Sequence, residues 1–130
     1  MILDTSFLID LLRGKDNNVK DRIDRLDKEF LIKGVTSISI MELWRGALQS
    51  TNEKEKKEIN ELLKSLLTFN LDENAAKEAA EIESELTKEG DIIDLEDIMI
   101  AGISKARNEV LLTRNVKHFK RIKSIKFEEY

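Results

Sequence analysis

The start of the chain decides the fold, and residues 1–10 read MILDTSFLID. The apolar residues 1–3 predict a short buried strand, and the apolar spacing of residues 5–14 predicts a helix that ends at Gly14. Asp4 stands at the junction between these two elements. Because a carboxylate taken out of water costs several kcal/mol unless something pairs with it, Asp4 either serves the local backbone or belongs to a site.

The alternation of short strands with helices continues along the chain. Strands that are separated by helices form a mostly parallel sheet with helices on both faces. With 130 residues and no break in composition, the chain is predicted to fold as a single α/β domain over residues 1–130. We expect further strands within residues 30–39 and at residues 69–71, 109–113 and 125–130, and further helices at residues 18–29, 40–50, 53–67, 72–90, 94–108 and 115–122.

The composition narrows the kinds of site that the chain can hold. It contains no cysteine, which excludes disulfides and thiolate metal sites and leaves the oxygen ligands that suit Mg²⁺, Mn²⁺ or Ca²⁺. No apolar stretch approaches the roughly 20 residues of a membrane helix. The apolar start is too short for a signal peptide and lacks its basic flank. We therefore expect a cytoplasmic protein that does not bind a membrane.

The net charge of −4 argues weakly against nucleic-acid binding, because phosphate partners favour a basic surface. One segment differs, since residues 114–126, RNVKHFKRIKSIK, contain six Lys or Arg and no acid. Its candidates for contacts with a phosphate backbone are Arg114, Lys117, Lys120 and Arg121. The alternative for this basic segment is an ordinary solvated surface.

Three acids stand where predicted helices begin. Asp4 can cap the first helix, Ser39 can cap a later one with Glu42 as its N3 partner, and Asp94 can cap a third with Asp97 at N3. An acid in a first helical turn contributes about 0.3–1 kcal/mol by complementing the helix dipole. Capping alone therefore explains each acid when it is considered separately.

Considered together, the three acids favour a site. The carboxyl ends of parallel strands lie at one edge of a sheet, so Asp4, Glu42 and Asp97 are expected to converge there. Carboxylates that converge repel one another unless a cation lies between them, and Mg²⁺ or Mn²⁺ suits hard oxygen ligands. Such an ion supports metal-assisted phosphodiester hydrolysis. Asp4, Glu42 and Asp97 are therefore the predicted catalytic residues and metal ligands.

A fourth junction follows the strand predicted at residues 109–113. Asn115 can cap the short helix that begins there, and its carbonyl oxygen is also a candidate metal ligand. His118 is the single histidine of the chain. It is either a half-exposed polar residue or an auxiliary site residue, as a nitrogen ligand, a proton carrier or a donor to phosphate.

Four segments in this order and spacing resemble the motifs of PIN-domain nucleases, and most of all the VapC-type ribonuclease toxins of toxin–antitoxin pairs. The resemblance extends from Ile2 to about Ile122 and implies a three-layer α/β/α sandwich with a Mg²⁺- or Mn²⁺-dependent endoribonuclease site. The segments are LDTSFLIDLLRG at residues 3–14, SISIMELWRGA at 37–47, DIMIAGISKARN at 97–108 and LLTRNVKHFKRI at 111–122.

The resemblance also assigns roles to residues. Asp4, Glu42 and Asp97 match the acids of the family, and Ser6 matches a hydroxyl that family members place near the metal. Family members often have a further acid in the segment that reads TRNVKHF here. Because Asn115 and His118 stand in the two candidate places, a second metal position lacks its usual acid.

The family also implies two protein partners, a cognate antitoxin and a second copy of the chain. Core packing is the default for the apolar stripe of one helix, and the small residues of the next helix suggest that the two form a close hairpin. In the family these helices can grip a helical segment of the antitoxin. For Trp44, core packing is favoured over stacking on a base. The residues of this hairpin are Ile59, Leu62, Leu63, Leu66 and Leu67 in one helix and Ala75, Ala76, Ala79 and Ala80 in the other.

Two other interpretations remain open at this point. A phosphoacceptor receiver domain is also an α/β sheet with acids and Mg²⁺ at one edge. It needs a pair of acids after the first strand and a lysine after a late strand, whereas residues 3–6 here read LDTS, with a single acid, and the late strand ends in TRN. A non-catalytic PIN-fold module that binds RNA or protein is the second alternative. Metal affinity without RNA cleavage distinguishes that module from an enzyme.

Overall fold

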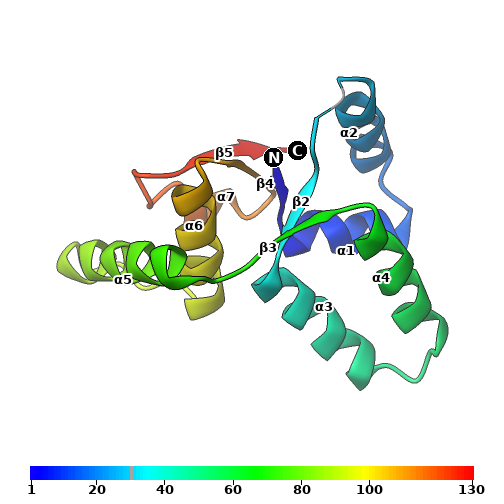
Figure 1. Ribbon diagram of the computed structural model, residues 1–130, viewed down its shortest axis with the longest axis horizontal. Helices are drawn as coiled ribbons and strands as arrows, with labels where there is room; N and C mark the ends of the chain where they lie inside the picture. The colour runs from blue at the N-terminus through cyan, green and yellow to red at the C-terminus, as the bar shows by residue number, and fades with distance from the viewer. Residues whose placement is uncertain (30) are drawn as a thin grey trace.

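A computed structural model describes residues 1–29 and 31–130 and shows a parallel sheet between two layers of helices (Figure 1). The five strands lie in the order β3-β2-β1-β4-β5, and every neighbouring pair is parallel. The predicted α/β/α sandwich is thereby confirmed. The strands are β1 (Ile2–Leu3), β2 (Gly34–Thr36), β3 (Leu67–Phe69), β4 (Val110–Thr113) and β5 (Lys126–Glu129), and the helices are α1 (Thr5–Arg13), α2 (Asn17–Lys28), α3 (Ser37–Gln49), α4 (Lys54–Lys64), α5 (Glu73–Lys88), α6 (Leu95–Arg107) and α7 (Val116–Phe119).

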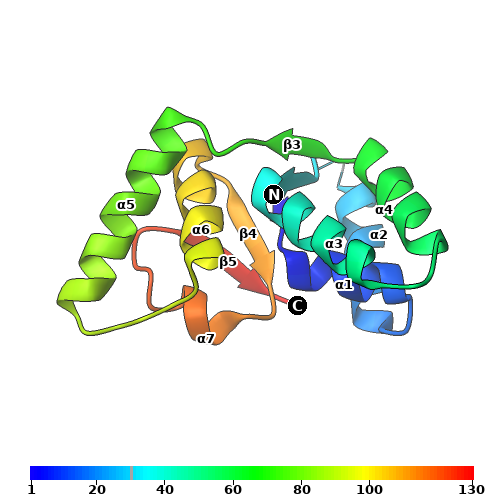
Figure 2. The same ribbon diagram turned by 90° about the horizontal axis from the view of Figure 1, so that it is seen from below.

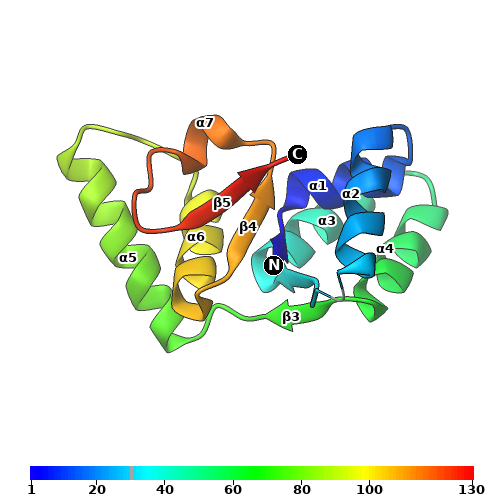
Figure 3. The same cartoon turned by 90° about the horizontal axis from the view of Figure 1, so that it is seen from above.

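The two faces of the sheet bury two separate hydrophobic cores. Because successive side chains of a strand point to opposite faces, Ile2 and Leu111 contribute to one core while Leu3 and Leu112 contribute to the other. Helices α5, α6 and α7 cover the first face, and α1, α2, α3 and α4 lie on the other side (Figures 2 and 3). The central strands are therefore buried from both sides, as their continuous apolar sequence predicts.

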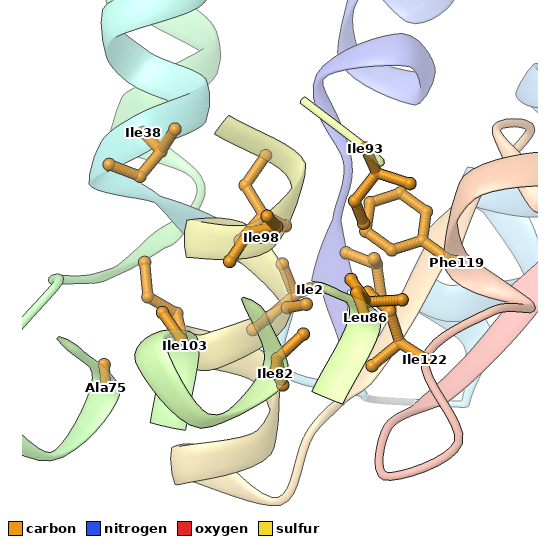
Figure 4. Packing of buried hydrophobic residues seen from close by; sticks show 14 residues of the cluster. Ile2, Ile38, Ala75, Ile82, Leu86, Ile93, Ile98, Ile103, Phe119 and Ile122 are labelled. Carbon is orange, nitrogen blue, oxygen red and sulfur yellow. The ribbon is translucent and has the colours of Figure 1, made fainter. Parts of the chain in front are cut away.

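The first core is built mainly from aliphatic side chains of α5 and α6. Figure 4 shows Ile82 and Leu86 of α5 gathered with Ile98 of α6 and with Phe119 of α7. Each of these side chains is at most 5% exposed. Full burial of such a side chain contributes about 1.5–3 kcal/mol, so this core fixes the layer from which Asp97 and His118 project.

Helix α5 packs along α6 at short range because α6 has a glycine at the contact. A Cβ atom added to Gly102 would lie 2.6 Å from the carbonyl oxygen of Ala75 and 2.7 Å from the Cβ of Ala79. The predicted hairpin between the helices at residues 53–67 and 72–90 is therefore wrong. Helix α4 packs against α3 at the other end of the molecule (Figure 1), where Ile59 is buried in the second core.

Several local predictions can be compared with the backbone. Gly14 ends α1 in the left-handed conformation with φ 64°, and the side chain of Asp72 caps α5 by accepting from the backbone N–H of Ala75, as expected. Strand β3 ends at Phe69, two residues before the predicted end. Within the strand predicted in residues 30–39, Phe30 lies outside the described residues.

The strand order places the candidate site at a reversal of the chain path. Strands β1, β2 and β3 follow one another outward on one side, while β4 and β5 lie on the other side of β1. The carboxyl ends of β1 and β4 thus flank a topological switch point, where open parallel sheets bind ligands. Asp4 and Arg114 directly follow these two strands. In the described part of the chain, no helix is long and apolar enough to span a bilayer.

The α5–α6 contact predicts opposite effects for alanine at two helical glycines. Gly102→Ala should lower the melting temperature, because two of its three nearest contacts are backbone atoms that cannot move aside and overpacking costs about 1–3 kcal/mol. Gly46→Ala is the matched control in α3, where an added Cβ meets no atom within 4 Å and alanine gains about 1 kcal/mol of helix propensity. Thermal melts that rank Gly102→Ala above the unsubstituted protein would contradict the packing.

Candidate active site

The carboxylate of Asp4 lies at the centre of the switch point. Asp4 is 4% exposed and occupies the N-cap position of α1, but its side chain makes no capping hydrogen bond. Its Oδ2 instead accepts from Thr113 Oγ1 at 2.6 Å and from Ser6 Oγ at 3.1 Å. The capping interpretation of Asp4 is therefore wrong, and the side chain is held by hydroxyl groups at the end of β4 and the start of α1.

Glu42 projects from α3 toward the same edge. Its Oε1 accepts a hydrogen bond of 2.7 Å from Thr5 Oγ1, in the residue that follows Asp4. The predicted capping box of Ser39 and Glu42 is wrong, because α3 begins at Ser37 and its N-cap is Thr36, whose Oγ1 accepts from the backbone N–H of Ser39 at 3.0 Å. Glu42 lies in the second turn, which leaves its carboxylate available to the site.

Asp97 projects from the N3 position of α6, as predicted, and is joined to the segment after β4. Its Oδ2 lies 2.6 Å from His118 Nδ1 and accepts from Asn115 Nδ2 at 3.1 Å. Asn115 stands at the N-cap of α7 without capping it, and its amide nitrogen rather than its oxygen faces Asp97. His118 is therefore part of the carboxylate cluster, together with Asp94, whose ligand atom lies within 4.8 Å of those of Asp97 and His118.

The electrostatics of the three carboxylates show that they share one poorly hydrated place. Burial raises the pKa of Asp4 above its ordinary value, and the negative charge of Asp97 raises it further. Burial also raises the pKa of Glu42, with added repulsion from Asp4 and Asp97. The pKa of Asp97 is raised by burial as well, although the hydrogen bond and charge of His118 oppose that increase. A cation bound among these groups would reverse the repulsion.

The donor set fits a divalent cation that prefers oxygen. Asp4, Glu42 and Asp97 reach this edge from three separate elements and act on one another's charge, and Ser6 adds a hydroxyl beside Asp4. The ligand atoms that lie within 4.8 Å of one another are those of Asp94, Asp97 and His118. Sequence reasoning missed Thr113, which orients the carboxylate of Asp4, and it considered Thr5 only as a polar neighbour of Ser6, not as the partner of Glu42. Each of these threonines stands beside a strand end in the sequence, which is the signal that could have identified them.

The four basic residues that were predicted to contact RNA fall into two pairs. Lys117 and Lys120 are exposed near the start and end of α7. Arg114 and Arg121 form ion pairs within the chain, with Asp10 at 2.6 Å and Asp91 at 3.7 Å. The basic segment is therefore partly neutralised by its own protein, and the lysines carry the more accessible charge.

The raised pKa values predict that Asp4→Asn stabilises the metal-free protein. The folded state binds the carboxyl protons of these acids more tightly than the unfolded state does. The free energy of unfolding therefore falls as the pH rises above the ordinary pKa values, which are 3.8 for Asp4 and 4.5 for Glu42. In EDTA near pH 7.5, Asp4→Asn should melt higher, by about 3–5 °C for each kcal/mol gained in a chain of this size. The same variant should lose most of the increase in melting temperature that Mn²⁺ gives.

The matched control for this experiment is Asp16→Asn. Asp16 caps α2 through the backbone N–H of Asn18 at an exposed position, and asparagine caps equally well. This variant has the same change in charge and should keep both the melting temperature and its Mn²⁺ response. An Asp4→Asn variant that melts lower than the unsubstituted protein in EDTA would refute the destabilising role of the Asp4 charge.

Comparison with known proteins agrees with this geometry. The chain is 29% identical over 130 residues to the tRNA(fMet)-specific endonuclease VapC of Salmonella typhimurium, covering 99% of this chain and 96% of that protein. It is 33% identical over 102 residues to ribonuclease VapC3 of Methanocaldococcus jannaschii, covering 78% of this chain and 95% of that protein.

Solved structures with the same fold include two complexes with DNA. VapBC2 from Rickettsia felis, bound to a DNA fragment from its promoter, matches with a TM-score of 0.92 at 25% identity and covers 99% of this chain and 97% of that one. DNA-bound VapBC from Salmonella typhimurium matches with a TM-score of 0.90 at 29% identity, covering 98% and 96%. Residues 1–125 also match the sequence profile of the PIN domain, and the chain therefore belongs to the PIN domain family.

Proposed function

We propose that this chain is an endoribonuclease toxin of the VapC type, which hydrolyses RNA phosphodiester bonds with the help of a divalent cation. The observation that carries the proposal is the convergence of Asp4, Glu42 and Asp97, whose pKa values are all raised, at the switch point of the sheet. Membership of the PIN domain family and the ribonuclease relatives support it. The receiver-domain alternative is set aside, because the family match covers residues 1–125.

Some site residues would bind the cation, and others orient the carboxylates that bind it. Asp4, Glu42 and Asp97 would hold Mg²⁺ or Mn²⁺, and when bound the ion would lower the pKa of a water molecule and offset phosphate charge. Thr113 and Ser6 fix the direction of the Asp4 carboxylate through their hydroxyl groups. The other carboxylates are oriented by Thr5 on Glu42 and by His118 and Asn115 on Asp97. As oriented, Asn115 serves Asp97 as a donor, and its role as a ligand requires the amide to turn.

RNA would approach this edge of the sheet along the basic segment. The exposed lysines Lys117 and Lys120 lie in and directly after α7, the helix that carries His118, and can contact backbone phosphates without reading base sequence. Arg114 and Arg121 can add phosphate contacts only through the N–H groups that their ion pairs with Asp10 and Asp91 do not use. Such contacts weaken with salt, because each one releases counterions from the RNA.

A cognate antitoxin is the proposed protein partner. The structural neighbours from Rickettsia felis and Salmonella typhimurium are VapBC complexes, and VapBC is a family of toxin–antitoxin systems. A groove of about 380 Å³ between α1, α3 and α4 suits an amphipathic segment of such a partner, because acids that include Glu42 of the candidate site line it beside apolar side chains. An occupant of this groove would thus contact the site directly. The apolar side chains that line it are Ile9, Leu12, Leu43, Ala47 and Ile59.

We further propose that the protein acts in the cytoplasm as a homodimer. Helix α3 presents Met41 and Leu48 to solvent, at 45% and 63% exposure, beside Trp44 and Arg45. Trp44 itself is partly buried against the second core, in agreement with its predicted packing role. A second copy that covered this face would remove the apolar surface from water.

A non-catalytic PIN-fold module remains the second candidate because of one substitution. His118 stands where family members often have an acid, so the cluster has fewer negative charges than the family pattern implies. Such a module would bind Mn²⁺ and RNA and cut nothing. The hydrogen bond between His118 and Asp97 keeps the Asp97 pKa from rising further, which suits metal binding in either candidate, so RNA cleavage is what separates them.

The proposed nuclease predicts metal-dependent cleavage that depends on each acid. The purified protein should cut a structured RNA pool with Mn²⁺ or Mg²⁺ and not with EDTA. Asp4→Asn and Asp97→Asn should each reduce the rate on the order of 100-fold or more, since residues one shell further from a metal already cost 10–100-fold. Asp16→Asn from a parallel preparation controls for the change in charge. A wild-type rate in either site variant would refute the assignment of these acids.

A further inference from the structure

A second buried carboxylate lies near the candidate site and is not explained by metal binding. Asp10, on α1, is 7% exposed, and its Oδ2 accepts from Arg114 Nη1 at 2.6 Å and from Tyr130 Oη at 2.9 Å. These residues come from α1, from the segment after β4 and from the residue after β5. Figure 3 shows these three segments meeting beside the carboxyl end of β4. Because a buried charge needs a partner, Asp10 fixes the position of the Arg114 guanidinium.

The contact leaves much of the guanidinium accessible. Arg114 has a side chain that is 53% exposed, and a guanidinium has five N–H donors. Among the described residues, the Arg114 guanidinium donates a hydrogen bond to Asp10 alone. The remaining donors are therefore available to an anion, and the fork geometry of arginine suits a phosphate.

The backbone of Arg114 is tied to the groups that hold Asp4. Arg114 directly follows Thr113, whose hydroxyl donates to Asp4, and its own backbone N–H donates to Ser6 Oγ at 3.5 Å. Ser6 in turn donates to Asp4. The arginine is thus fixed at two points, by its backbone beside the carboxylate cluster and by its side chain on Asp10.

Tyr130 completes this arrangement through its ring and its hydroxyl. The ring meets Phe7 edge-on, with 4.8 Å between centroids and an angle of 88° between planes. Burial raises the pKa of Tyr130 to about 12, so the hydroxyl keeps its proton at neutral pH and donates to Asp10. A phenylalanine in this position would keep the packing on Phe7 and lose only the hydrogen bond.

We propose that Asp10 and Tyr130 are positioning residues that hold Arg114 to receive a backbone phosphate of RNA beside the three carboxylates. The inference rests on the proposed function, because RNA is the anion that the site would act on. A free arginine side chain loses rotamer entropy when it is fixed, and a side chain that is already fixed loses less on binding. Asp10 and Tyr130 therefore act on RNA affinity only through Arg114.

A double-mutant cycle tests this dependence without catalysis. Binding of a fluorescein-labelled single-stranded RNA of about 20 nucleotides is measured by anisotropy in EDTA at several salt concentrations. Tyr130→Phe should weaken binding about threefold in the wild-type background and leave it unchanged in the Arg114→Gln background. Arg114→Gln alone should reduce the slope of log K against log salt by about 0.7, the value for one phosphate contact on a single strand.

Arg107→Gln provides the matched control background. Arg107 is also an arginine paired with an aspartate, Asp72 at 2.9 Å, but it lies at the end of α6 away from Asp97. Tyr130→Phe should keep its threefold effect in this background. The inference would be overturned if Tyr130→Phe weakened binding equally with and without Arg114, or did not weaken it at all. It would also be overturned if Arg114→Gln had the same affinity and salt slope as the wild type.

The two proposals fail in different ways. Metal-dependent cleavage by the wild type, without coupling between Tyr130 and Arg114, would overturn the positioning role and leave the nuclease intact. Coupling in EDTA without any cleavage in Mn²⁺ would support the phosphate contact and contradict the catalytic proposal. Thermal melts of Tyr130→Phe show whether a loss of affinity comes from unfolding.

Discussion

Burial of three carboxylates at one poorly hydrated edge of the sheet is the constraint on which the rest of the site depends. Burial raises the pKa of Asp4, Glu42 and Asp97, and the charge of Asp97 raises the pKa of the other two further. If Asp4 served only as a helix cap, its carboxylate would accept from the first backbone N–H groups of α1. Here the Asp4 carboxylate makes no capping bond and receives two side-chain hydroxyls instead. The arrangement sacrifices stability in the absence of a cation, as expected of a functional site.

Hydrophobic packing on both sides of the sheet offsets the unfavourable burial of these carboxylates. The aliphatic core around Ile82 and Leu86 supports α6 and therefore Asp97, and the close α5–α6 contact depends on Gly102. On the other face, α1 and α3 carry the remaining acids, and Thr5 links them by donating to Glu42. Each carboxylate thus stands on or beside a packed helix, which fixes the direction in which it projects at this edge of the sheet.

The sequence predicted what depends on local pattern and missed what depends on distant contacts. The apolar run at Ile2–Leu3, the left-handed Gly14 and the Asp72 cap follow from short segments. The packing of α5 against α6 could not be predicted in this way. The alanines of α5 can pack against any close helix, and the contact with α6 depends on Gly102, which lies in a different part of the sequence. In the candidate site, the three acids were proposed from their positions at junctions between strands and helices. The bonds from Thr113 to Asp4 and from Arg114 to Asp10 join residues 109 and 104 positions apart, and no local pattern indicates them.

Crystals of the protein soaked with Mn²⁺ would locate the ion through its anomalous signal, independently of activity. We expect a peak bounded by the carboxylates of Asp4, Glu42 and Asp97, and its loss in Asp4→Asn crystals. A peak confined to Asp94 and His118, or no peak while the three carboxylates keep their positions, would contradict the claim that these acids form a metal site.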